Sequence, residues 1–204
     1  MDTSDLYRDI TDFAHATPHW VQSAFEVWTE YGLLLFGLLY IAVWWRARGR
    51  RDPRAVARAV LAPLVTALAY VASEVVKSTI NEERPCRAVA RAAASLVPCP
   101  PHGDWSFPSN HSAIAGAAAV ALALAVPRLA ALTLPMALLM AFSRVFVGAH
   151  YPHDVGMGLL LGASLGALAV ALLTGPTTRV IAAVQGSGIR AAVWFTGPGP
   201  ARHP

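Results

Sequence analysis

Two histidines and one carboxylate lie within seven residues, "GAHYPHD" at 148–154, between two apolar runs. Asp154 follows His150 by four residues, so its carboxylate can hold one imidazole nitrogen and leave the other free to attack an electrophile. His153 is adjacent to Asp154, where the backbone makes the same contact awkward. We therefore predict that His150 is a nucleophile oriented by Asp154, and that His153 begins a helix near the lipid headgroups.

A cationic pair is expected upstream, in "KSTINEERP" at residues 77–85. Lys77, the only lysine of the chain, precedes Arg84 by seven residues, so a continuous helix would place both on one side, two turns apart. Pro85 would then end that helix. The pair would clamp an anion; the alternative is a lysine that snorkels to the interface beside an unrelated arginine.

A third cluster, "FPSNHS" at residues 107–112, opens another apolar run. Pro108 and Ser109 favour a helix start, so the free amides of Ser109, Asn110 and His111 are expected to point at one anion. Taken alone this is an ordinary helix cap. The His111 side chain adds a titratable proton donor beside the anion, which suits a general acid.

The three clusters together suit phosphoryl transfer. Arg144, near the end of an apolar run, is costly in a membrane unless it faces a polar cavity. Together with Lys77 and Arg84, it would neutralise the phosphate oxygens. One histidine would attack phosphorus and the other would protonate the leaving oxygen. The predicted phosphate ligands are Lys77, Arg84, Ser109, Asn110 and Arg144.

The elements that must position these residues are membrane helices. Of the 204 residues, 55% are hydrophobic and 14% are charged, and the mean hydropathy is +0.47. This composition predicts an all-α, polytopic membrane bundle of five to six transmembrane helices. Five apolar runs reach or approach the span length of about 20 residues: 28–45, 56–76, 112–126, 129–147 and 155–174.

The segments outside these runs are expected to be peripheral. Residues 1–25 have no long apolar core, so we expect an amphipathic interfacial helix and no cleavable signal peptide. Residues 26–176 are predicted to form the membrane domain, and residues 177–204 a cytoplasmic tail in which 180–195 is a surface helix or a frayed end.

The arginines indicate the orientation of the bundle. Six of them crowd one short loop, which is cytoplasmic by the positive-inside rule: Arg46, Arg48, Arg50, Arg51, Arg54 and Arg58. Alternation then puts residues 77–111 and 148–154 on the outer face. The net charge of +4 is therefore explained without a nucleic-acid partner. Cys86 and Cys99 lie in the long outer loop, where a disulfide is expected, although unpaired cysteines remain the alternative.

These motifs are similar to the three-part signature of the type 2 phosphatidic acid phosphatase (PAP2) superfamily, K-x6-RP, PSxH and SR-x5-H-x3-D, over residues 77–154. The resemblance implies a helical core like that of these phosphatases and the haloperoxidases. It also implies metal-independent hydrolysis through a phosphohistidine at His150, with Asp154 as its partner and His111 as the acid. The family commonly has glycine at the position of Asn110, and its membrane members usually have six spans.

The substrate and some alternatives stay open at this point. The chain resembles bacterial plasma-membrane members that act on undecaprenyl pyrophosphate; phosphatidic acid, phosphatidylglycerol phosphate and diacylglycerol pyrophosphate are further candidates. No cofactor and no metal are expected, and the oligomeric state is left open. The rival hypotheses are a non-catalytic lipid headgroup binder or transporter, a soluble-type vanadate haloperoxidase, and a zinc hydrolase using His102, Asp104, His111, His150, His153 and Asp154.

Overall fold

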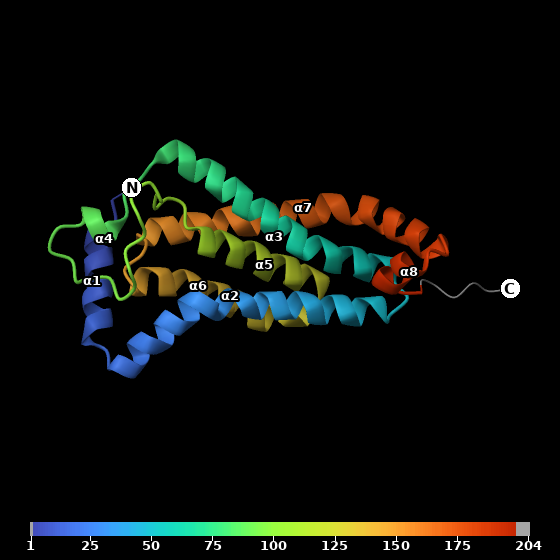
Figure 1. The fold of residues 1–204 in the computed structure, drawn as a ribbon, viewed down its shortest axis with the longest axis horizontal. Helices are drawn as coiled ribbons and strands as arrows, with labels where there is room; N and C mark the ends of the chain where they lie inside the picture. Colours follow the sequence, from blue (N-terminus) through green and yellow to red (C-terminus); the bar gives the residue numbers. More distant parts are fainter. Residues whose placement is uncertain (1, 199–204) are drawn as a thin grey trace.

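The protein is a bundle of helices in a computed structural model that describes residues 2–198, and no strand occurs among them (Figure 1). The elements are α1 (Ser4–Ala16), α2 (His19–Arg48), α3 (Pro53–Ile80), α4 (Pro85–Ala88), α5 (Asn110–Ala125), the 3-10 turn η1 (Pro127–Leu129), α6 (Ala130–Phe146), α7 (Pro152–Gly186) and α8 (Arg190–Thr196). The predicted all-α membrane bundle is confirmed.

The predicted apolar runs all lie in helices of the bundle. Four helical segments are long and apolar enough to cross a membrane by length and composition: His19–Arg48, Pro53–Ala88, Pro127–Phe146 and Pro152–Gly186. The fifth run is the shorter α5, which packs against α3, α6 and α7. Its alanines 115, 117 and 118 and Leu122 are fully buried. Because its side chains are small, α5 can serve as the central helix around which the others close.

Glycines bring α5 and α7 into backbone contact. A Cβ added at Gly162 would lie 1.9 Å from the carbonyl oxygen of Ala113, and one at Gly158 would lie 2.5 Å from that of Ser109. Only glycine permits such an approach without a backbone shift. The contact at Gly158 fixes the start of α5 against the start of α7, and these two helix starts carry the second and third predicted clusters.

The amino-terminal helix α1 crosses one end of the bundle, roughly perpendicular to the long helices (Figure 1). Its Tyr7 is buried, and the phenol donates a hydrogen bond to the carbonyl of Gly148 at 3.0 Å. His15 Nε2 lies 2.7 Å from the carbonyl of Ala94 in the long loop. The predicted interfacial helix therefore also holds the two loops that surround the site.

The helix bounds differ from the sequence-based segments at both ends. α2 begins at His19, before the predicted boundary at residue 26, and α7 continues through residue 176 to Gly186. The segment 180–195, predicted to be one surface helix or a frayed end, is the last part of α7 followed by α8. α8 is held to α2 because Trp44 Nε1 donates to the carbonyl of Phe195 at 3.1 Å. The break between the two helices falls at the residues that interrupt the apolar run, because α7 ends at Gly186 and α8 begins at Arg190.

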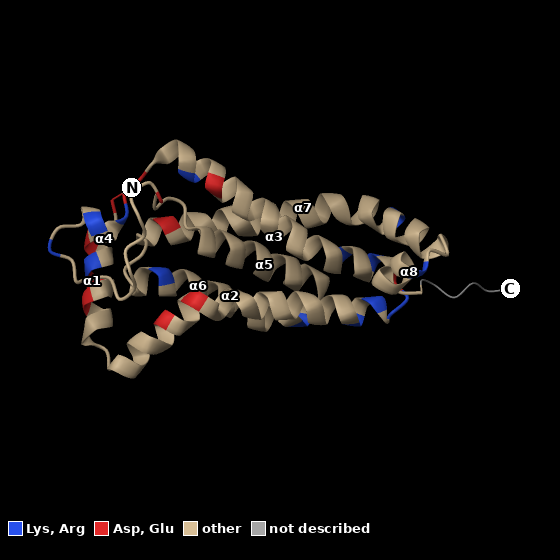
Figure 2. Ribbon diagram, viewed as in Figure 1, with Lys and Arg blue, Asp and Glu red and all other residues tan. Residues whose placement is uncertain are grey.

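Charged residues gather at the two ends of the bundle (Figure 2). At the end away from α1, the turn between α2 and α3 carries the arginine cluster. At the α1 end, basic and acidic residues lie together near α4 and the starts of α5 and α7. The end crossed by α1 holds the predicted site.

Candidate active site

His150 and Asp154 meet as their spacing predicts. His150 Nδ1 lies 3.3 Å from Asp154 Oδ2, and both side chains are buried, at 2% and 0% exposure. The same carboxylate oxygen accepts a hydrogen bond from the backbone N–H of Tyr151 at 2.9 Å and another from the Ser106 hydroxyl. Asp154 belongs to the first turn of α7, whose start at Pro152 fixes its position. The carboxylate therefore holds the imidazole ring from one side.

Arg84 faces the other imidazole nitrogen. Its Nη1 lies 3.1 Å from His150 Nε2 and donates to the carbonyl of Ala149 at 3.1 Å. An arginine only donates hydrogen bonds, so this contact assigns a lone pair to Nε2 and the ring proton to Nδ1, where Asp154 accepts it. Nε2 is thus the nitrogen that carries the lone pair, and the Arg84 guanidinium lies beside it.

The two cations predicted as a clamp are joined by a carboxylate. Asp104 Oδ1 lies 2.9 Å from Arg84 Nη2 and 3.5 Å from Lys77 Nζ. Lys77 also lies 3.7 Å from Glu74 Oε1. Lys77 and Arg84 are buried, whereas the Asp104 side chain is 43% exposed. A single oxygen therefore touches both cations at the edge of the site, as an oxygen of a bound phosphate would.

The route by which Lys77 and Arg84 come together differs from the prediction. The helix does not continue to Pro85: α3 ends at Ile80, and Asn81 has a left-handed backbone with φ +53°. Pro85 begins α4 instead of ending a helix. Asparagine tolerates this conformation better than most residues, which explains why the chain turns here. Arg84 reaches the site from an extended segment, and the interpretation of two turns of one helix was wrong.

The start of α5 is only partly available to an anion. The Ser109 amide, predicted to be free, donates to the carbonyl of Asp154 at 3.1 Å. Ser109 is the N-cap, and its hydroxyl accepts from Ser112 N at 3.5 Å. The Asn110 side chain turns to α3, where it accepts from Ser73 at 2.7 Å and donates to Glu74. Asn110 and His111 are the first residues of α5, so their amides have no partner within the helix.

Arg144 and His111 complete the group. Arg144 is 8% exposed, and its Nη1 donates to Thr29 Oγ1 at 2.8 Å, while its buried Nε has no hydrogen-bond partner among the described residues. An arginine in this state has donors left for an anion. Burial lowers the pKa of His111 to about 3, together with nearby charges that a bound phosphate would offset, those of Arg144, His150, Lys77 and Arg84. The three predicted clusters therefore converge on one site.

Burial and neighbouring charges set the protonation states of His150 and Asp104, which lie in the connections between the long helices. Burial lowers the pKa of His150 well below 6.5, and the Arg144 and Arg84 charges lower it further. The ring is therefore neutral near pH 7, as a nucleophile requires. Burial alone would raise the pKa of the Asp104 carboxyl, but its hydrogen bond to Arg84 and the Arg84 and Lys77 charges bring it below its ordinary value. Asp104 is therefore an anion facing two cations.

Several residues of the site were not predicted. Asp104 was considered only as a zinc ligand, and Ser106 and Thr29 were not considered. Ser106 lies in the "SFPS" stretch, two residues before Pro108, and such proximity to a motif is the one sequence signal that it offers. Thr29 lies far from the motifs in sequence and offers no signal. Cys86 and Cys99 form a disulfide, with Cα atoms 6.1 Å apart, which closes residues 86–99 just before the segment that carries Asp104 and Ser106.

The six-residue zinc constellation is not assembled. His102 is exposed, with 83% of its side chain accessible, and lies 3.9 Å from Glu83. Among residues 2–198, the one group of three or more such side chains close enough to share an ion is Glu82, His153 and Asp154. It contains two of the six ligands of the rival zinc hypothesis, His153 and Asp154, and one residue, Glu82, that was not among them.

Known proteins are similar to this chain in sequence. A family model described as the PAP2 superfamily matches residues 58–176. An undecaprenyl-diphosphatase of Sulfolobus acidocaldarius is 37% identical over 115 residues, 55% of this chain and 54% of the relative. Undecaprenyl-diphosphatase BcrC of Bacillus subtilis is 32% identical over 149 residues, 72% of this chain and 67% of that protein. A lipid A 1-phosphatase of Rhizobium johnstonii is 38% identical over 92 residues, 45% of this chain and 38% of that protein.

Solved structures show the same fold. The crystal structure of Aquifex aeolicus LpxE superposes with a TM-score of 0.62 at 25% identity, covering 82% of this chain and 93% of that one. The transmembrane PAP2 type phosphatidylglycerolphosphate phosphatase of Bacillus subtilis gives a TM-score of 0.60 at 22% identity, covering 84% and 86%. The chain spans about half the length, or less, of the first curated relatives it matches. The chain belongs to the PAP2 superfamily.

Proposed function

We propose that the protein is a phosphatase that removes a phosphate from a membrane lipid phosphate or pyrophosphate through a phosphohistidine at His150. The observation that carries the proposal is the pair of contacts on the His150 ring, with Asp154 at Nδ1 and Arg84 at Nε2. These contacts orient a neutral nucleophile toward a cation that can hold the phosphate. Relatives named as lipid phosphatases and diphosphatases support the same reaction class.

The reaction proceeds in two displacements. His150 Nε2 attacks phosphorus and forms a P–N bond, the P–O bond to the lipid breaks, and His111 gives a proton to the leaving oxygen. Water then attacks the phosphohistidine, His111 takes its proton, and inorganic phosphate leaves with the His150 ring restored. Lys77, Arg84 and Arg144 neutralise the charge on the transferred phosphoryl group, and the free amides of Asn110 and His111 add donors.

We propose undecaprenyl pyrophosphate as the substrate, with the site on the outer face of a bacterial plasma membrane. Two of the matched relatives are named undecaprenyl-diphosphatases. The arginine-rich turn between α2 and α3 lies at the end of the bundle opposite the site (Figure 2), which favours a cytoplasmic turn and an outer site. Phosphatidic acid, phosphatidylglycerol phosphate and diacylglycerol pyrophosphate belong in the test beside it.

The test is phosphate release from this panel by purified protein in detergent, with EDTA present. We expect release from at least one lipid in EDTA, and loss of that release in His150→Ala. His153→Ala is the matched control, because His153 is the other histidine of the same segment and is expected to retain most activity. Lipid binding without hydrolysis in wild type and His150→Ala alike would favour a headgroup binder. Activity that EDTA abolishes would contradict the metal-independent reaction.

A further inference from the structure

The side of Asp154 that faces away from His150 has no hydrogen-bond donor. Asp154 Oδ1 is buried and has no hydrogen-bond partner among the described residues, although Oδ2 has several. His153 Nε2 lies 3.3 Å from this oxygen without the geometry of a hydrogen bond. A buried carboxylate oxygen without a donor is unfavourable, and it calls for a positive partner.

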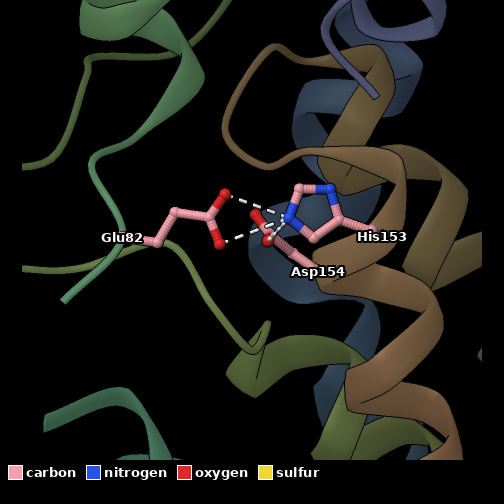
Figure 3. Close-up of side chains that lie close together, drawn as sticks. All are labelled: Glu82, His153 and Asp154. Atoms are coloured by element: carbon pink, nitrogen blue, oxygen red, sulfur yellow. Dashed lines mark hydrogen bonds and ion pairs between the residues drawn. The ribbon is translucent and has the colours of Figure 1, made fainter. Parts of the chain in front are cut away.

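A second carboxylate approaches the same imidazole nitrogen. The Glu82 oxygens lie 3.0 and 3.2 Å from His153 Nε2, and Figure 3 shows both carboxylates converging on that nitrogen. A neutral ring carries at most one hydrogen on Nε2, which serves one carboxylate and leaves the other without a donor. Glu82 comes from the segment after α3 and Asp154 from α7, so the chain folds two distant carboxylates onto one histidine.

The spacing of these atoms fits a small divalent cation. In a tetrahedral zinc site with bonds of about 2.0–2.2 Å, neighbouring ligand atoms are about 3.3–3.6 Å apart. The His153–Asp154 and His153–Glu82 separations of 3.0 to 3.3 Å are close to this range, and all three ligand atoms lie within 4.8 Å of one another. Two carboxylates also balance the charge of a dication.

The other ring nitrogen of His153, Nδ1, also has a hydrogen-bond partner. His153 Nδ1 lies 2.7 Å from Thr3 Oγ1, so Nδ1–H can donate to the threonine while Nε2 keeps its lone pair for a metal. Metal-bound histidines in proteins usually have such a partner on their second nitrogen. The ring also stacks on Tyr151, with centroids 5.2 Å apart, which fixes its plane.

We infer that Glu82, His153 and Asp154 form an inhibitory site for Zn²⁺ or a similar divalent transition metal, distinct from the phosphate-binding cations. The inference rests on the proposed function for its effect on activity. A metal on Asp154 Oδ1 withdraws charge from the carboxylate that orients His150. The ring then becomes a weaker base and a weaker nucleophile at Nε2. Zn²⁺ therefore slows hydrolysis without taking part in it.

Binding is tested first, on tag-free protein in detergent. The protein is stripped with EDTA, exchanged into chelator-free buffer, and titrated with Zn²⁺ by calorimetry and with Co²⁺ by visible absorption. We expect one Zn²⁺ per chain and the visible bands of low-coordinate Co²⁺, both lost in Glu82→Gln. Glu83→Gln is the matched control, because Glu83 pairs with Arg87 outside the cluster and should leave binding unchanged. Absence of binding, or equal binding by Glu82→Gln, would overturn the site.

Inhibition is tested on the same proteins. We expect saturating Zn²⁺ to lower kcat by about tenfold or more, the range typical of perturbed outer-shell partners, in wild type and Glu83→Gln. Glu82→Gln, which does not touch Asp154 or His150, should keep its metal-free activity and lose the inhibition. Site-dependent binding without inhibition would overturn the coupling to Asp154. If no lipid is hydrolysed, the proposed function fails, whereas the titrations still decide the metal site.

Discussion

The two ends of the bundle use cations in different ways. At the end opposite α1, arginines 46, 50, 51 and 54 are exposed in and around one turn, and Arg48 lies over Trp45 and Trp194, 4.6 Å from each ring centroid. At the α1 end, Lys77, Arg84 and Arg144 are buried. Burial of the whole side chain, and not charge itself, therefore distinguishes the site from the arginine-rich turn, because an exposed arginine has little reason to be fixed in place.

The largest effect is expected from removing a buried cation. Arg84→Ala should lower kcat/KM by about 10²–10³-fold, the typical loss for a donor that stabilises a transition state. Arg50→Ala, at the opposite end, should leave kcat/KM unchanged. Size-exclusion chromatography first checks that both variants are folded. Initial rates with the preferred lipid then give kcat/KM for each. Equal losses in the two variants would show that only overall charge matters.

The packing that joins the clusters gives the next effect. Gly162→Ala places a methyl group against the Ala113 backbone and should lower the free energy of unfolding by about 1–3 kcal/mol. Gly156→Ala lies on the same helix with nothing within 4 Å of the added carbon, so its stability should be unchanged or slightly raised. Thermal unfolding in detergent compares them. A Gly162→Ala melting temperature equal to that of wild type would refute the close α5–α7 contact.

Removing the carboxylate between the two cations should have a smaller effect, and it should strengthen phosphate binding instead of weakening it. Asp104 is partly exposed, and such pairs contribute about 1 kcal/mol or less. Asp104→Asn should therefore tighten competitive inhibition by inorganic phosphate by up to roughly fivefold, since Lys77 and Arg84 no longer face a competing anion. Asp5→Asn, whose partner Arg8 lies on α1, is the control. Weaker phosphate inhibition in Asp104→Asn would mean that the carboxylate mainly positions Arg84.

The smallest expected effect is on the pH profile. The pKa of His150 is lowered below 6.5, so the ring stays neutral until the pH falls through that lowered pKa. The acid limb of kcat/KM set by His150 should therefore lie below pH 6.5. Arg144→Met removes one of the charges that lower the pKa and should move the limb upward toward 6.5. A wild-type limb at or above pH 6.5 would contradict the buried, cation-flanked nucleophile.

Much of this site could be predicted from spacing, and the exceptions have physical reasons. The i, i+4 offset of His150 and Asp154 is local geometry, so it survives whatever surrounds it. The spacing of Lys77 and Arg84 did not predict how the two side chains come together, because Asn81, in a left-handed conformation, turns the chain between them. Contacts between distant segments, such as Glu82 with His153 or Arg144 with Thr29, depend on how the helices pack. No local pattern encodes them.

For the fold as well, local sequence features predicted some elements and contacts between distant segments decided the rest. Hydropathy predicted the five apolar runs, but the α7 end at Gly186 lies well beyond the predicted membrane segment, because its last turns still pack in the core through the buried Ile181 and also contact α8. The role of α1 was predicted only as an interfacial helix. Its contacts with Gly148 and Ala94 join residues far apart in sequence and required the structure.

In the proposed reaction, His150 Nε2 becomes covalently phosphorylated. The most direct test mixes purified protein with its lipid substrate, quenches in alkali, where phosphohistidine survives, and locates the phosphate by peptide mass spectrometry. We expect a phosphate on His150 during turnover and none in His150→Ala. Modification of His111 or His153 instead, or rapid hydrolysis with no phosphorylated peptide in a quench within a single turnover, would contradict it.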